Sequence, residues 1–142
     1  MSDEKNRKEA GRWLATANDD LESARILEKS GQYAHACFHA QQAAEKSLKA
    51  VWIHEDADPW GHSVKKLIDN LESVNLITHQ YFDQYAHSGL VLDRFYVPTR
   101  YPNGLPDLTP AEAFLADDAS HCLLLAEIIV AAVDRFISPA KR

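Results

Sequence analysis

The stretch "ACFHAQQAAEKSLKA", residues 36–50, decides the fold because it predicts a helix that is buried on two sides. It contains good helix formers and neither glycine nor proline. At 100° per residue one arc is apolar, and a second arc holds small side chains that let another helix approach closely. Such a helix belongs at the centre of a bundle. The apolar arc consists of Cys37, Ala44, Leu48 and Val51, and the small arc of Ala36, Ala40, Ala43, Ser47 and Ala50.

One polar residue, Gln41, falls inside the apolar arc, and Glu45 lies one turn later at its edge. A buried amide needs hydrogen-bond partners. Glu45 is the nearest candidate, because side chains four residues apart meet on a helix. Two interpretations stay open. Either Gln41 fixes the helix in place through an internal hydrogen bond, or Gln41 and Glu45 line a cleft.

The third face of this helix is polar and holds two histidines, His35 and His39, at a spacing that can bind zinc. No third ligand is apparent nearby, and no glutamate stands between them as in a metalloprotease helix. We therefore expect no metal. A glycine-rich phosphate loop, a Ser-His-Asp set and a CxxC pair are also absent from the sequence, so we expect no cofactor. The remaining residues of this face are Gln42, Lys46 and Lys49.

Apolar periodicity along the rest of the chain predicts further helices and no strands, since no segment alternates with period two. The last helix should begin at Thr109, where Pro110 and Glu112 complete a capping box. The sequence predicts an all-α fold: an up-and-down bundle of four to five helices in one domain, residues 1–142. The expected helices are 4–29, 33–53, 62–74, 76–96 with a break near Gly89, and 109–137, and the expected loops are 54–61 and 97–108.

Composition narrows the class of protein. With 142 residues, 46% hydrophobic and 25% charged, the chain resembles an ordinary globular domain. Its net charge of −6 argues against a DNA-binding surface, although a local basic pocket is compatible with it. The most apolar segment, 122–133, is far shorter than the roughly 20 residues of a membrane span. The charged start indicates no signal peptide. Cys37 and Cys122 are expected to be buried thiols, which fits the cytoplasm.

Four short motifs, in this order, resemble the HEPN family, the higher eukaryotes and prokaryotes nucleotide-binding domain. The resemblance runs from Trp13 to the last helix, and it is to the branch with an RYP loop. It implies a helical bundle that is often a homodimer. Relatives are frequently encoded beside, or fused to, a minimal nucleotidyltransferase, and several are ribonucleases, some acting as toxins. The motifs are "DDLESAR" (19–25), "QQAAEKSLKA" (41–50), "GHS" (61–63) and "RYP" (100–102).

The ribonuclease branch of the family carries an arginine followed, after four to six residues, by a histidine. This chain lacks the pair. For Arg94 the histidine would have to lie at 99–101, and for Arg100 at 105–107, but neither range contains a histidine. The resemblance then favours a nucleotide- or RNA-binding module that dimerises and partners a minimal nucleotidyltransferase, as in a toxin–antitoxin pair. The alternative is a metal-independent ribonuclease with a rearranged site that uses Arg100 and either His62 or Lys49.

The expected ligand site centres on Arg100, because an arginine on a proline-fixed loop suits the planar geometry of phosphate. Tyr101 could stack on a base, while Lys46 and Lys49 hold phosphate. These groups meet only if loop 97–108 folds back over the second helix. The alternative role for Arg100 is to cap a helix end.

Three further residues, Gln41, Glu45 and His62, complete the expected ligand site. His62, directly after Gly61, could orient against a carboxylate or contact a ligand. It could equally cap the next helix or close the loop. Spacing alone leaves the role of His62 open.

Overall fold

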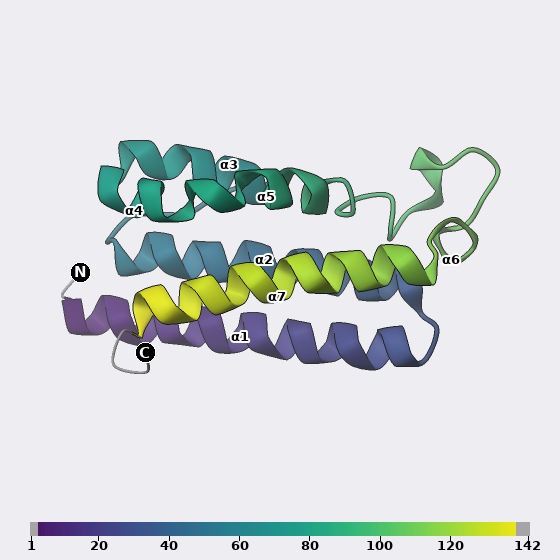
Figure 1. The fold of residues 1–142 in the computed structure, drawn as a ribbon, viewed down its shortest axis with the longest axis horizontal. Helices are drawn as coiled ribbons and strands as arrows, with labels where there is room; N and C mark the ends of the chain where they lie inside the picture. The colour runs from purple at the N-terminus through teal and green to yellow at the C-terminus, as the bar shows by residue number, and fades with distance from the viewer. Residues whose placement is uncertain (1–2, 139–142) are drawn as a thin grey trace.

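Three long helices form one layer of the fold (Figure 1). The structure, a computed structural model, describes residues 3–138. Helices α1 (Asp3–Lys29), α2 (Tyr33–His54) and α7 (Ala116–Ile137) pack against one another, with α2 and α7 running opposite to α1. Helix α1 ends where predicted, because Gly31 takes a φ of +80°, a conformation that favours glycine. The all-α bundle predicted from the sequence is confirmed.

Short helices form a second layer above α2 (Figure 1). This layer contains α3 (Val64–Asp69), α4 (Leu76–Phe82) and α5 (Ala86–Asp93), joined by 3₁₀ turns at 70–73 and 83–85. The indole Nε1 of Trp52 on α2 donates a hydrogen bond to the carbonyl of Leu67, at 3.0 Å, and so ties the two layers together. Between the long helices α2 and α7, the up-and-down bundle therefore contains short helices rather than one long helix.

Helix α2 is the centre of the core, as its two buried arcs predict. Both arcs are fully buried, and α1 supplies small residues of its own to the extensive α1–α2 contact. Small side chains on both helices allow the backbones to approach closely. The second layer supplies larger apolar side chains, including Ile68, Leu71 and Phe82. The small buried residues of α1 are Ala10, Ala17 and Ala24.

The predicted helix over 76–96 is wrong in its break and its end. The chain breaks at 83–85 rather than near Gly89, and α5 ends at Asp93. Gly89 lies within α5 because the helix crosses α3 closely there. A Cβ atom at Gly89 would lie 3.0 Å from the backbone nitrogen of Lys65 and 3.1 Å from Cγ1 of Val64. The glycine marks a close helix contact, and sequence alone does not distinguish that from a break.

The predicted last helix starts at the expected cap but does not continue from it. Thr109 and Glu112 form the capping box, with Glu112 N 3.3 Å from Thr109 Oγ1 and Thr109 N 3.1 Å from Glu112 Oε1. This box begins only α6 (Pro110–Ala113). Phe114 and Leu115 are extended, and the Phe114 ring packs on Phe95 at 5.8 Å between ring centroids, so the chain turns before α7.

Helix α7 is apolar but does not span a bilayer. Within residues 3–138 no helix has both the length and the apolar character that a membrane crossing requires. Cys122 of α7 is buried beside Cys37 of α2, and both thiols are free. A hydrogen bond with Cys37, together with burial, raises the pKa of the Cys122 thiol, so this thiol is uncharged at neutral pH.

We predict opposite effects for alanine at two glycines. Gly89→Ala should lower the free energy of unfolding by about 1–3 kcal/mol, because the new methyl group meets the α3 backbone. Gly11→Ala, in the exposed part of α1 with open space around its Cβ position, should raise it by about 0.5–1 kcal/mol. Urea unfolding of both variants measures the two values. A neutral Gly89→Ala would show that α3 and α5 are not packed this closely.

Candidate functional site

Gln41 is fully buried between α2 and the loop that precedes α3. Its amide nitrogen lies 3.2 Å from Glu45 Oε1 and 3.2 Å from the carbonyl oxygen of His62, and it donates to both. Its amide oxygen accepts a hydrogen bond from Gln42 Nε2 at 2.8 Å. Gln41 therefore lies below the surface, where it fixes the position of the His62 backbone.

Glu45 is a buried carboxylate with several donors. Lys49 Nζ lies 3.2 Å from Glu45 Oε2, and His62 Nδ1 lies 3.4 Å from the same oxygen. The other oxygen, Oε1, accepts from the amides of Gln41 and Gln42. A buried charge is tolerated only when it is paired and hydrogen-bonded, and both conditions hold here. Glu45 thus links two groups that can carry positive charge.

His62 stands at the surface above this carboxylate, with 60% of its side chain exposed. Its ring stacks on Tyr96, with 4.9 Å between centroids and an angle of 17° between planes. Because Nδ1 faces Glu45, Nε2 is the ring nitrogen left to exchange a proton or a hydrogen bond with a ligand. A histidine oriented by a carboxylate is an arrangement suited to acid–base chemistry.

Arg100 also contacts the Tyr96 ring, and its guanidinium is held among aromatic rings. Its guanidinium carbon is 4.4 Å from the centroid of Phe38, 4.6 Å from that of Tyr96 and 5.1 Å from that of Tyr101. Its Nε donates to the Tyr96 carbonyl at 2.9 Å, which fixes the plane of the group. Phe38 belongs to α2, so the loop folds back over that helix, as the expected site requires.

The Arg100 guanidinium has N–H donors available for a ligand. Across residues 3–138, we find no hydrogen bond or ion pair made by its two terminal amino groups. A planar pair of N–H donors matches the oxygens of a phosphate or carboxylate. We call this surface, formed by Phe38, Glu45, His62, Tyr96, Arg100 and Tyr101, the Arg100 patch.

Asp93 positions both parts of the patch, and the sequence analysis missed it. Its carboxylate accepts hydrogen bonds from Ser63 Oγ and from the Val64 backbone nitrogen, each at 2.6 Å. Ser63 in turn caps α3 by accepting from Lys66 N at 3.0 Å. The carboxylate at the end of α5 thus holds the start of α3, next to His62. Ser63 belongs to the "GHS" motif, but Asp93 lies 30 residues later, outside the four motifs, and sequence spacing does not show that the two meet.

Lys46 does not join the Arg100 patch. Its Nζ lies 2.8 Å from Asp20 on α1, and His39 Nδ1 lies 3.6 Å from the same carboxylate. Burial raises the pKa of Asp20, but hydrogen bonds from His39 and Lys46 and the lysine charge outweigh it, so its pKa lies below the ordinary value. His39, considered above as a zinc ligand, therefore pairs with a carboxylate. Within residues 3–138 no three potential metal ligands cluster.

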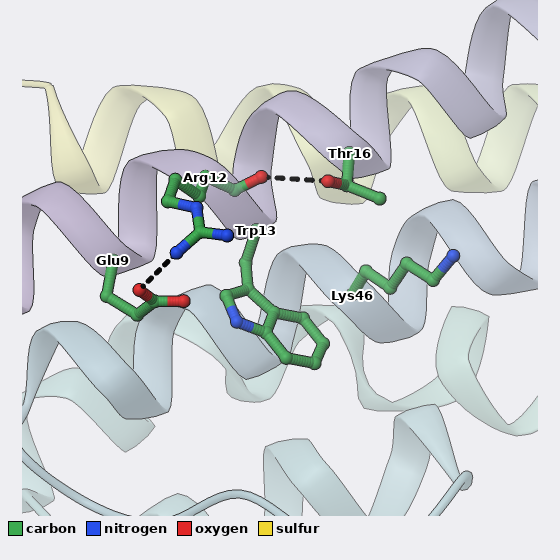
Figure 2. Close-up of a pocket in the computed structure, with 5 residues that line it drawn as sticks. All are labelled: Glu9, Arg12, Trp13, Thr16 and Lys46. Carbon is green, nitrogen blue, oxygen red and sulfur yellow. Dashed lines mark hydrogen bonds and ion pairs between the residues drawn. The ribbon is translucent and has the colours of Figure 1, made fainter.

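A hollow of about 350 Å³ opens between α1 and α2 on the Lys46 side (Figure 2). Figure 2 shows the Trp13 indole at its centre, between the Arg12–Glu9 ion pair and Lys46. Lys49 Nζ lies 6.0 Å from the centroid of that indole. Trp13 carries no functional signal in the sequence, because its spacing in α1 matches that of core residues. The residues that line the hollow are Glu9, Arg12, Trp13, Thr16 and Lys46.

The HEPN domain family model matches residues 10–136, nearly the whole chain. The chain belongs to the HEPN family. Its fold agrees with a crystal structure of TT1696 from Thermus thermophilus, at a TM-score of 0.80 and 36% identity over 89% of this chain and 96% of that one. An archaeal HEPN homologue, ST0689, aligns at a TM-score of 0.74 and 30% identity, covering 91% of this chain and 98% of that chain.

One relative carries a functional name. A candidate toxin of Methanocaldococcus jannaschii, MJ1304, is 29% identical over 139 residues, which cover 93% of this chain and 90% of that protein. A HEPN domain protein of Thermotoga maritima shares 31% identity and the fold, at a TM-score of 0.67, over 89% of this chain and 98% of its own. The similarity thus extends across nearly the full length of these proteins.

We predict that truncating the Gln41 amide destabilises this HEPN domain. Gln41→Ala removes a donor from buried Glu45 and should cost about 1–3 kcal/mol of unfolding free energy. Gln41→Leu should also be destabilising, because Glu45 is itself buried and water does not replace the lost donor. His35→Ala, at an exposed position of the same helix, is the matched control with a smaller expected cost. Thermal melts compare the three variants, and an unchanged Gln41→Ala melt would contradict the burial.

Proposed function

We propose that this HEPN protein binds nucleotides or RNA at the Arg100 patch. The observation that supports this most directly is Arg100 itself, whose guanidinium plane is fixed by three rings and by the Tyr96 carbonyl. Its terminal donors are therefore already oriented, which reduces the entropy lost when a phosphate binds. Tyr101, half exposed beside it, offers a ring on which a base can stack.

A second candidate function, RNA cleavage, is favoured by the pairing of His62 with Glu45. In this reaction His62 Nε2 would take the proton of a ribose 2′-hydroxyl as its oxygen attacks the adjacent phosphorus. The bond from phosphorus to the leaving 5′-oxygen would break, leaving a 2′,3′-cyclic phosphate, and the 5′-oxygen would take a proton from water. Arg100, which shares the Tyr96 ring with His62, would hold the phosphate. Glu45 would act as the positioning group for His62.

The biological setting we infer is a toxin–antitoxin-like pair in the cytoplasm. The named relative MJ1304, a candidate toxin, supports the toxin half of this inference. A minimal nucleotidyltransferase is the partner that the family resemblance implies. The two free, buried cysteines are compatible with a reducing compartment.

We predict that Arg100→Ala weakens binding of labelled nucleotides and short RNAs by roughly tenfold or more, because hydrogen bonds to charged groups are worth about 1.5–3 kcal/mol. The slope of log affinity against log salt should fall by about one. Arg100→Lys keeps the charge but not the planar donors, so it should restore binding only in part. Equilibrium binding at two salt concentrations gives both values.

The same RNA samples test the second function. Cleavage products that appear with the wild type and vanish with His62→Ala would support catalysis. RNA that stays intact would instead support binding without cleavage. Lys29→Ala, which removes a cation at the far end of α1, controls for net charge and should bind like the wild type. If the wild type binds no nucleotide or RNA, or Arg100→Ala binds equally well, the proposed function is refuted.

We also propose that the protein forms a homodimer through the α1–α7 face. One stripe of helix α7 is open: Leu124 is 55% exposed and Ile128 41% exposed. Ile26 of α1 adds to the open apolar surface at 57%. Arg25 and Glu127 form an ion pair across the two helices in the same region, at 3.4 Å. An apolar stripe bordered by charges suits a symmetric interface between two copies.

We predict a dimer of the 16.0 kDa chain in sedimentation at micromolar concentration. The double variant Leu124→Glu/Ile128→Glu should sediment as a monomer, because it places charge in the apolar stripe. Ile77→Glu changes a more exposed apolar residue on α4 and should leave the dimer intact. A wild-type monomer, or a double variant that still dimerises, would contradict this interface.

A further inference from the structure

The Trp13 hollow has a charge balance unlike that of the Arg100 patch. Arg12 is paired with Glu9 at 3.1 Å, and Lys46 with Asp20 at 2.8 Å, so its cations are already neutralised. The hollow therefore does not favour a phosphate. It offers instead an indole ring with hydrogen-bond donors and acceptors around it, including the hydroxyl of Thr16. A nucleobase has this combination: an aromatic plane with donors and acceptors along its edges.

The size of the hollow also suits one base. Its volume of about 350 Å³ lies within the range of small-ligand pockets. A second hollow of about 310 Å³ shares Trp13 and Glu9 and continues towards the loop after α2. The indole therefore has open space on more than one side, although the residue also packs against the core. That packing holds the ring in place and makes it a rigid stacking surface.

One partly buried edge of α2 runs from the hollow to the Arg100 patch. Lys49 lies beside Trp13 and pairs with Glu45, which contacts His62 of the patch. Phe38, beneath Arg100, and Lys49 are eleven residues apart on the same helix, which at about 1.5 Å per residue places them roughly 16 Å apart. Stacked nucleotides rise about 3.4 Å each, so several of them are needed to reach from one site to the other.

We propose that Trp13 is a base-stacking subsite for single-stranded RNA that also places a phosphate on Arg100. The ligand is then a short single strand that runs along α2 from Trp13 to His62 and Arg100, rather than a mononucleotide. This inference rests on the proposed function and specifies its ligand. It assigns the two ends of the site different tasks: Arg100 holds the charged backbone, and Trp13 holds a base.

Fluorescence anisotropy with labelled oligoribonucleotides of one, two, four and six residues tests this proposal. For the wild type, affinity should rise by roughly tenfold or more from one to six residues, as the strand gains the stack on Trp13. Trp13→Leu should remove most of this gain, and Trp13→Phe, which keeps a ring, should preserve much of it. Binding of the mononucleotide should be the same in all three proteins.

Two controls separate stacking from charge and from misfolding. A hexamer with the same phosphates but abasic sugars should bind the wild type about as weakly as Trp13→Leu binds the normal hexamer. The length series on the wild type needs no variant, so it remains decisive even if Trp13→Leu unfolds, which a thermal melt detects.

The outcomes distinguish this proposal from the proposed function. If the mononucleotide and the hexamer bind equally, if the abasic hexamer binds as well as the normal one, or if a folded Trp13→Leu binds the hexamer like the wild type, the Trp13 subsite is refuted while binding at Arg100 stands. If none of these ligands binds the wild type, both proposals fail together.

Discussion

A buried carboxylate in the middle of the central helix sets the conditions for the rest of this structure. Glu45 is charged and almost completely enclosed, so it persists only with a full set of donors. Those donors come from the turns of α2 directly before and after Glu45, and from the loop before α3. The need to satisfy one charge thus brings Gln41, Lys49 and His62 to fixed positions. A purely apolar contact between the layers would not have placed a histidine with this orientation.

The acidic character of the chain is compatible with a site for anions because its charges are arranged locally. The lysines of α2 each have a carboxylate partner, Lys46 in Asp20 and Lys49 in Glu45. Arg100 is different, since rings rather than carboxylates surround its guanidinium. Cation–π contacts stabilise a cation without neutralising its charge or consuming its N–H donors. The net charge of the chain therefore does not reveal Arg100, although its guanidinium suits a phosphate.

Local physics explains which parts of the fold were predictable. The two buried arcs of α2, the glycine stop after α1 and the Thr109 cap all depend on residues within one or two turns, and the structure has each of them. The buried Gln41–Glu45 hydrogen bond was predictable for the same reason. The break at Phe114 and the place of Gly89 were not, because each depends on a partner far along the chain, Phe95 in one case and α3 in the other. The role of Asp93 was not predictable for the same reason, since its partners lie in the loop before α3. The stacking of Arg100 on Tyr96 and Phe38 was not predictable either, because it depends on the path that loop 97–108 takes over α2.

The Asp93 cap has a mechanical consequence. One carboxylate joins the end of α5 to the start of α3, so the segments that carry His62 and Arg100 are fastened to each other as well as to α2. The Asp93 bonds therefore couple the position of α3 to that of α5 within the short-helix layer. A movement of that layer away from α2 would separate His62 from Glu45 and Arg100 from Phe38 in the same step. The separation of His62 and Arg100 therefore depends on the junction between α5 and α3 as well as on α2.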